Sequence, residues 1–324
     1  MKTQLFDFAE NVFLDESSAY TWEQLVETEF LERLMRSLKE EMGKEFFYYK
    51  FYIFSHFKLD VLPSSITSVD KNNILIYISD ELASIPTHLM KHYHAIFKSY
   101  LPHEVKGNIF SFGLGYTNGV HRFDSTPAME RPINVFFSGF LHNTRFPLYV
   151  ALHPYLKYFP KFFTKIITNI PFKSKWRKLL RMDFSNTTRH GKNYIKFTNG
   201  FMKGVSAREY GNLLSKSKIV LCPRGGYSPE TFRHLEAIRA GAIVISEQLP
   251  DTYFYRGAPF LCFKNWNDGL REVDRILSNP RELQQLQRKS IEWYESVCSE
   301  IGAARYMKEK IEEIDKGQKS DKNI

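Results

Sequence analysis

The sequence predicts an α/β fold with two domains built on parallel sheets. At 324 residues the chain is long enough for two packed cores. Lys218–Ser246 reads as a strand, a glycine-rich loop, a helix and a second strand, which is the repeating unit of a parallel sheet. Asn73–Ser79 is nearly all apolar, as an interior parallel strand should be.

The segment Lys218–Ser246 contains the elements that a ligand site needs. Ile219–Cys222 is a short apolar run, and the loop after it contains two glycines that let backbone approach a ligand closely. Ser228 is a suitable N-cap for a helix that runs to about Ala240. Ala242–Ser246 is then the second strand.

The start of this helix is a predicted anion site. A helix N-terminus offers free N–H groups and a partial positive charge, and Arg224 and Arg233 add guanidinium forks suited to phosphate. Glu236, three residues after Arg233, suits vicinal hydroxyls such as those of a nucleotide ribose. The alternative is that Arg233 and Glu236 form an ordinary surface pair.

These residues resemble the donor-binding half of a GT-B glycosyltransferase, in particular the exostosin-like (family 47-type) group. The shared pattern, S-K-hydrophobic-C-P-x-G followed by R-x-x-E-A-x-x-A-G, is matched here by Ser217–Gly225 and Arg233–Gly241. The resemblance covers about the last two-thirds of the chain. Ile243–Ser246 lacks the family's proline, and Glu230 and Glu236 lie too close for the wider E-x7-E pattern, which leaves the role of Glu230 open.

The resemblance implies two Rossmann-like domains whose parallel sheets face a central cleft. Residues 1–128 would form the acceptor-side domain and residues 129–324 the nucleotide-sugar-binding domain, with the last helices crossing back to the first domain. Asp124–Arg131, which contains Pro127, is the expected linker.

The same resemblance implies roles for residues of the second domain. Glu236 would bind the donor ribose, and Arg224 and Arg233 would lie near the diphosphate. Arg145 follows an expected strand and would neutralise the departing diphosphate, unless it is a structural arginine near a helix start. The expected donor site comprises Gly139, Arg145, Arg224, Gly225, Gly226, Tyr227, Ser228, Thr231, Arg233 and Glu236.

The expected activity is transfer of a sugar from a nucleotide-sugar donor to a glycan or lipid-linked acceptor, in bacterial surface polysaccharide synthesis, with inversion. The chain has no Asp-x-Asp triplet, which favours metal-independent catalysis without a further cofactor. Asp80 and Glu81 end the strand Asn73–Ser79 and are the candidates for the base that takes the acceptor's proton. Their alternative is an acidic pair that initiates a helix.

Charge and cysteine usage suggest where the protein works. The net charge of +9 suits nucleic acid, an anionic membrane or an anionic substrate, and the lack of a nucleic-acid motif favours the last two. Three widely spaced cysteines and an acidic N-terminus without a signal peptide predict a cytoplasmic protein, with peripheral contact at the inner membrane face. The basic, aromatic segment 159–181 is either a membrane or acceptor patch or a solvated amphipathic helix.

The N-terminal part of the chain carries further expectations. Residues 1–20 read as irregular, Trp22–Gly43 as a helix, and Glu45–Phe57 and Ala95–Tyr100 as strands. A helix after Pro86 would hold two histidines, His88 and His92, with the spacing of zinc ligands. No third ligand is evident, so these are expected to face solvent or acceptor.

Three rival functions remain open at this point. A polyol-phosphate transferase would use the same phosphate site. A non-catalytic nucleotide- or glycan-binding module would need Glu236 but not Asp80 or Glu81. A basic RNA- or membrane-binding protein would show a steep salt dependence of binding.

Overall fold

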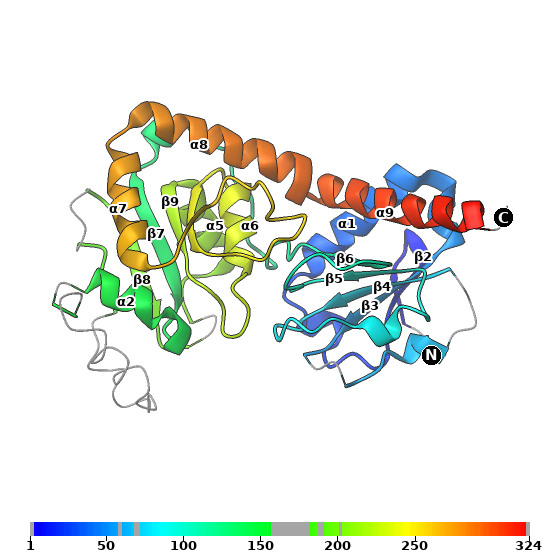
Figure 1. Cartoon of the computed structure of the whole chain (residues 1–324). Helices are drawn as coiled ribbons and strands as arrows, with labels where there is room; N and C mark the ends of the chain where they lie inside the picture. Colours follow the sequence, from blue (N-terminus) through cyan, green and yellow to red (C-terminus); the bar gives the residue numbers. More distant parts are fainter. Residues whose placement is uncertain are drawn as a thin grey trace. The chain divides into compact units, whose positions relative to one another are not determined.

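The structure is a computed structural model that describes residues 3–57, 60–67, 72–153, 155–156, 182–186, 191–200 and 203–321. The basic segment 159–181, predicted as either a membrane or acceptor patch or a solvated amphipathic helix, lies outside the described residues. The chain forms two compact units: unit 1 holds residues 1–118, 250–257 and 294–324, and unit 2 holds 119–249 and 258–293. Each contains a largely parallel sheet, which confirms the prediction of two Rossmann-like α/β units (Figure 1).

The chain first passes between the units after Asn118, before the segment 124–131 that the sequence suggested as a linker. Arg131 explains why that segment belongs to unit 2. Its buried guanidinium donates to the carbonyls of Thr126, Ser217 and Ala240 at 2.7–3.0 Å and so holds the segment against the second sheet. A linker would instead have its polar groups in water.

The sheet of unit 1 has six strands in sequential order: β1 (Thr3–Phe6), β2 (Ala9–Leu14), β3 (Lys50–Ser55), β4 (Asn73–Ile78), β5 (Ala95–Lys98) and β6 (Ile109–Ser111). β1 and β2 pair antiparallel and every other pair is parallel. The expectation that residues 1–20 are irregular was therefore wrong. The β1–β2 hairpin is short, and it places Asn11 inside, where its amide donates to the carbonyls of Phe46 and Tyr49 at 2.9 Å.

Two helices of unit 1 lie side by side along its sheet, α1 (Thr28–Met42) and α9 (Glu300–Asp321) (Figure 1). Helical spacing buries Phe30, Leu34 and Leu38 of α1. The predicted helix start at Trp22 was too early, because Trp22–Gln24 is a separate 3₁₀ turn with its own capping residues. The expected strand from Glu45 likewise begins only at Lys50, since Gly43–Tyr48 forms a 3₁₀ helix.

The sheet of unit 2 is entirely parallel, with β7 (Ile133–Phe140), β8 (Tyr194–Thr198), β9 (Ser217–Cys222), β10 (Ile243–Glu247) and β11 (Leu261–Phe263) in the order β11-β10-β9-β7-β8. The strand that follows β7 in the chain lies on one side of it, and β9 lies on the other. The strand order therefore reverses between β7 and β9. In open α/β sheets, ligands bind beyond the carboxyl ends of the strands at such a reversal.

The helices of unit 2 are α2 (Phe146–Leu152), α5 (Ala207–Ser215), α6 (Phe232–Arg239), α7 (Trp266–Leu277) and α8 (Pro280–Trp293). Short 3₁₀ helices at Ser64–Thr67, Thr87–Leu89, Ala128–Glu130 and Asn143–Arg145, and a π-helical stretch at Tyr294–Cys298, complete the described elements. One core cluster joins sheet residues such as Val135, Leu221 and Ile245 to Trp266 and Ile276 of α7.

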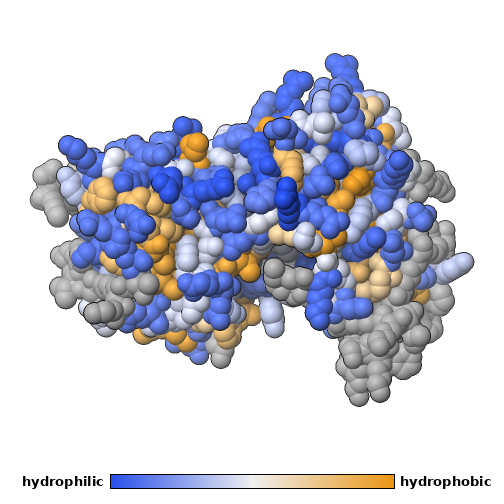
Figure 2. Space-filling model, turned by 180° about the vertical axis from the view of Figure 1, so that it is seen from behind, coloured by the Kyte–Doolittle hydropathy of each residue, from blue (hydrophilic) through white to orange (hydrophobic). Residues whose placement is uncertain are grey.

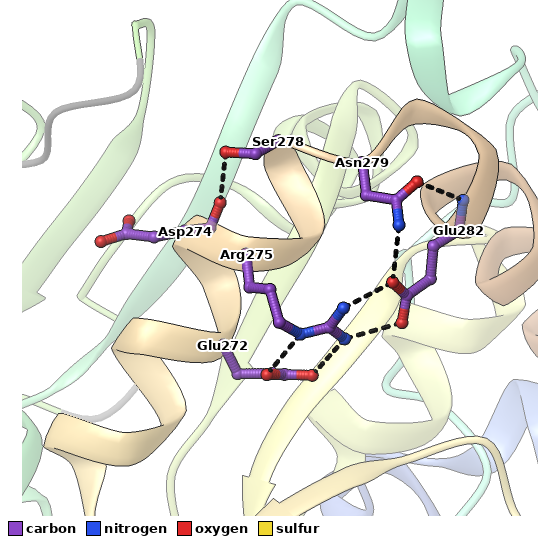
Figure 3. A network of polar contacts seen from close by, with 6 residues as sticks. All are labelled: Glu272, Asp274, Arg275, Ser278, Asn279 and Glu282. Carbon is purple, nitrogen blue, oxygen red and sulfur yellow. Dashed lines mark hydrogen bonds and ion pairs between the residues drawn. The ribbon is translucent and has the colours of Figure 1, made fainter.

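Arg275 bridges the corner between α7 and α8 (Figure 3). Its guanidinium contacts both carboxylate oxygens of Glu272 on α7 and both of Glu282 on α8, at 2.6–2.8 Å. Asn279, between the two helices, donates to Glu282 as well. The side chain of Arg275 is half exposed, so water screens this network and it sets the corner's geometry more than its stability.

On the face drawn in Figure 2, apolar residues occur in small groups among hydrophilic ones. Among the helices that the structure describes, none is both long and apolar enough to cross a membrane.

Candidate functional site

All ten predicted donor-site residues lie in unit 2, at the carboxyl end of β7, in the loops after β7 and β9, or on α6. The loops after β7 and β9 are about 80 residues apart in sequence and meet where the strand order reverses. Thr144 Oγ1 donates to the carbonyl of Gly225 at 2.8 Å. Arg145 donates through Nε to the carbonyl of Arg224 at 3.2 Å and through Nη1 to that of Phe140 at 3.1 Å. Arg145 therefore connects the loop after β7 to the loop after β9 through these hydrogen bonds.

Arg233, from the first turn of α6, reaches the end of β7. Its Nη2 donates to the carbonyl of Ser138 at 2.7 Å, and its guanidinium lies 5.0 Å from the centre of the Phe137 ring. The residue is 9% exposed. Its Nε and Nη1 are buried and have no hydrogen-bond partner among the residues that the structure describes. The Tyr210 side chain lies close to the same guanidinium. Buried guanidinium donors are normally satisfied, so Nε and Nη1 are the donors that a ligand bound here would fill.

Gly139 separates the two arginines at the end of β7. A Cβ at this position would lie 2.8 Å from Nη2 of Arg233, which would have to shift, and 3.0 Å from Nη1 of Arg145, which would have to move by a few tenths of an ångström. The glycine therefore lets two guanidinium groups converge on one point of the backbone. Two converging cations beside strand ends favour a group with more than one negative charge.

Arg233 stays protonated despite its burial. Burial alone acts to lower its pKa, but the neighbouring Tyr210, Cys222 and Glu236 raise it above the ordinary value. Burial also raises the pKa of the Cys222 thiol. Cys222 is therefore a neutral residue that lines the site and not a nucleophile.

Glu236 is 5% exposed on α6, close enough to Arg233 to influence its charge. The sequence left open that Arg233 and Glu236 form an ordinary surface pair. The structure excludes this alternative, because both residues are buried. The two charges instead form part of the interior that faces the ends of β7 and β9.

The loop between β9 and α6 is held by its own hydrogen bonds. Gly225 N–H donates to the carbonyl of Ser228 at 2.9 Å, and Arg224 Nη2 donates to that of Tyr227 at 2.9 Å. A Cβ on Gly225 would lie 3.0 Å from that same Ser228 oxygen, so only glycine allows this close approach. Arg224 also has a buried Nε without a hydrogen-bond partner among the described residues.

The helix N-cap is Thr231, not Ser228 as predicted, and α6 begins at Phe232. Thr231 has extended backbone angles, and its N–H donates to Nδ1 of His234 at 3.1 Å. Ser228 is buried in the loop, where its Oγ accepts from the Glu230 N–H at 3.3 Å. The local pairing of Thr231 with His234 therefore decides where the helix starts.

His234 is a site residue that the sequence reasoning missed. It is fully buried, and burial lowers its pKa to about 4. Its Nδ1 lies 3.1 Å from the Thr231 N–H and 3.0 Å from the Thr231 carbonyl, and its Nε2 is hydrogen-bonded to Ser246 Oγ at 2.8 Å. Ser246 in turn donates to the Cys222 carbonyl at 3.1 Å. This chain ties the start of α6 to β9 and β10. The position three residues after Thr231 holds a histidine instead of the usual glutamate or glutamine, so the sequence pattern carried little signal for this cap.

Asp80 does not occupy the position of an accessible base. Its carboxylate is fully buried in unit 1, 3.0 Å from Nζ of the equally buried Lys98, and it also accepts from Ser84 Oγ. A base must reach the proton that it takes, and a sealed ion pair does not. The helix-initiating alternative is not observed either, because Asp80 and Glu81 lie in a turn. Glu81 is exposed.

His56 is a second polar residue that sequence reasoning missed, at the carboxyl end of β3 in unit 1. Its ring stacks between Phe54 and Phe57, with centroids 5.9 and 5.0 Å apart. The predicted helix with His88 and His92 is reduced to the 3₁₀ turn Thr87–Leu89. Within the described parts of the chain, no group of three potential metal ligands occurs.

No family model matches the chain, and no curated protein matches it. Among solved structures it is similar to a glycosyltransferase involved in avilamycin A biosynthesis, at 12% identity over 90% of each chain and a TM-score of 0.43. It is also similar to sucrose-phosphate synthase from Thermosynechococcus elongatus, at 12% identity over 94% of this chain and 83% of the other, with a TM-score of 0.44. A third is an alpha-glucosyltransferase in complex with UDP and a 13-mer DNA containing a HMU base, at 10% identity over 81% and 79%, with a TM-score of 0.41.

Proposed function

We propose that the protein is a glycosyltransferase whose nucleotide-sugar donor binds at the carboxyl ends of β7 and β9. The buried guanidinium of Arg233, whose Nε and Nη1 have no hydrogen-bond partner among the described residues, carries the proposal. It lies where the strand order reverses, next to Gly139 and Arg145. A diphosphate has the charge and the oxygen geometry to fill these donors.

In the proposed reaction, an acceptor hydroxyl attacks the anomeric carbon and the bond to the diphosphate oxygen breaks. The nucleoside diphosphate leaves with the electron pair, and Arg233, with Arg145 and Arg224, stabilises its growing charge. A base takes the acceptor's proton, and of the two predicted carboxylates only Glu81 is exposed. The proposal includes membership of the exostosin-like group and a reaction that inverts the anomeric configuration without a metal. It also includes a glycan or lipid-linked acceptor in surface polysaccharide synthesis. So does cytoplasmic location beside an anionic membrane, which the net charge of +9 supports.

Thermal stability of the pure protein, with and without nucleotides, tests the donor site. UDP, GDP, CMP, ADP and TDP are added without metal, and at least one should raise the melting temperature, because a ligand of the native state stabilises it by mass action. Arg233→Met should abolish the shift and Arg233→Lys should reduce it, since lysine keeps the charge but not the planar fork. Arg271→Gln, an exposed arginine of α7, is the control. Absence of any shift in folded wild-type protein would reject the proposal.

A non-catalytic nucleotide-binding module is the second candidate, because Asp80 is sealed in its ion pair with Lys98. Release of the nucleoside diphosphate from a bound nucleotide sugar distinguishes the two. Turnover that falls in Glu81→Gln, with nucleotide binding intact, supports the transferase. Binding without turnover with every acceptor class tried supports the module.

A further inference from the structure

Tyr227 is a solvent-exposed aromatic residue in the loop that carries the anion site. It is 70% exposed, whereas its neighbour Ser228 is buried. Among the described residues, the Tyr227 ring has no recorded stacking or cation–π partner and its hydroxyl has no recorded hydrogen bond. Single exposed apolar residues are common on proteins, so exposure by itself means little.

The backbone beneath this ring is fixed, and that sets Tyr227 apart. Its own carbonyl accepts from Arg224 at 2.9 Å, and the loop closes through Gly225 N–H and the Ser228 carbonyl at 2.9 Å. Thr144, from the loop after β7, holds the Gly225 carbonyl at 2.8 Å. The ring is therefore presented on an ordered backbone. A tyrosine has only two side-chain torsions to immobilise, which keeps the entropy loss on contact small.

The loop that carries Tyr227 is hydrogen-bonded to the arginines at the end of β7, which suits a ligand with two chemically different ends. Arg224 binds the Tyr227 carbonyl, and its own carbonyl is bound by Arg145, which lies with Arg233 beside Gly139. One short chain of hydrogen bonds thus connects the backbone that carries the Tyr227 ring to the converging guanidinium groups. A nucleoside diphosphate matches this layout, since it joins a flat aromatic base to a polyanion.

We propose that Tyr227 is the stacking platform for the nucleobase of the donor, while the diphosphate binds Nε and Nη1 of Arg233, next to Gly139. This inference rests on the proposed function and deepens it. Stacking on an aromatic ring is available to every base, so Tyr227 contributes affinity without selecting one base. Base selection must come from other groups.

Calorimetric titration with two ligands tests the inference: the nucleoside diphosphate that stabilises the protein best, and inorganic pyrophosphate, which has no base. Tyr227→Ala should weaken nucleoside diphosphate binding about tenfold or more, as expected for loss of one stacked base. Pyrophosphate affinity should not change. Tyr227→Phe keeps the ring and should bind the nucleotide as the wild type does. Because the side chain is exposed, neither variant should affect folding.

The outcomes separate the inference from the proposed function. Nucleotide binding that is lost in Arg233→Met but unchanged in Tyr227→Ala overturns the platform and leaves the donor site standing. An equal loss of nucleotide and pyrophosphate affinity in Tyr227→Ala also overturns it, because the loop would then act on the phosphates alone. Wild-type protein that binds neither ligand rejects both proposals.

Discussion

Lys98 and Asp80 form an ion pair in which neither side chain has any contact with solvent, with Nζ 3.0 Å from Oδ2. The pair links the ends of β4 and β5. Lys98 also donates to the carbonyl of Ser99 at 3.0 Å and lies 4.9 Å from the centre of the Tyr77 ring. Ser79, which precedes Asp80, has a φ of 73°, a conformation that is strained for residues other than glycine. The pair therefore holds an unusual turn at the carboxyl edge of the sheet.

Removing one partner of this pair should be severe. We expect Lys98→Met to destabilise unit 1 by about 3–5 kcal/mol, because Asp80 is left buried without a counter-charge. The double variant Asp80→Asn/Lys98→Met should recover much of that loss. Urea unfolding followed by circular dichroism measures both. A Lys98→Met variant as stable as the wild type would mean that Asp80 reaches water.

Gly139→Ala should affect binding more than folding. The new Cβ would displace the guanidinium groups of Arg233 and Arg145, and we expect nucleoside diphosphate affinity to fall about tenfold or more. Gly317→Ala on α9 is the matched control, because a Cβ there meets nothing within 4 Å. Calorimetric titration measures the difference. Unchanged affinity in Gly139→Ala would show that ligand binding does not need the two guanidinium groups in place.

His234 should make the stability of unit 2 sensitive to acid. Burial lowers its pKa to about 4 from an ordinary 6.5, so between these values the unfolded chain takes up a proton that the native state does not. The stability that His234 confers is complete above about pH 6.5 and falls by about 3 kcal/mol as the pH drops to about 4. His234→Gln should lose this slope in denaturant titrations between pH 4 and 7. If the unfolding free energy of His234→Gln depended on pH as steeply as that of the wild type, this prediction would be wrong.

Glu27 should act in the opposite direction in unit 1. Burial raises the pKa of this carboxyl, at the start of α1, to about 7 from an ordinary 4.5. The native state therefore keeps a proton that the unfolded chain has lost, and the contribution to stability disappears as the pH rises through 7. The free energy of unfolding of the wild type should be higher at pH 6 than at pH 8. That of Glu27→Gln should change less between these two pH values. Parallel titration curves for the two proteins would exclude this.

The residue pattern was informative wherever neighbours in sequence decide the structure. Apolar runs predicted β4, β5, β9 and β10 to within a few residues, because an interior parallel strand must be apolar on both faces. The residue pattern misled where a polar side chain is hydrogen-bonded to backbone groups that are distant in sequence. Asn11 makes β2 look irregular, yet its amide binds carbonyls 35 and 38 residues away.

The candidate site shows the same division. Arg224, Gly225, Arg233 and Glu236 were evident from one strand–loop–helix unit, since their spacing alone places them beside a helix start. The start itself was misplaced at Ser228, because the competing cap uses a histidine side chain, whose capping role has little sequence signal. Asp80 was predicted to be a base because a carboxylate that follows a strand has the same sequence pattern whether it is exposed or buried in an ion pair with Lys98.

By itself, then, the sequence determined two α/β units and a cationic loop at the end of a strand, since hydrophobic periodicity and glycine positions act over a few residues. Only the tertiary structure decided that β7 and β9 are neighbours, which brings Arg145 and Arg233 to Gly139 and buries the Nε and Nη1 groups of Arg233. Strand order depends on how whole faces pack, and the free energy of that packing is summed over contacts between residues far apart in the chain.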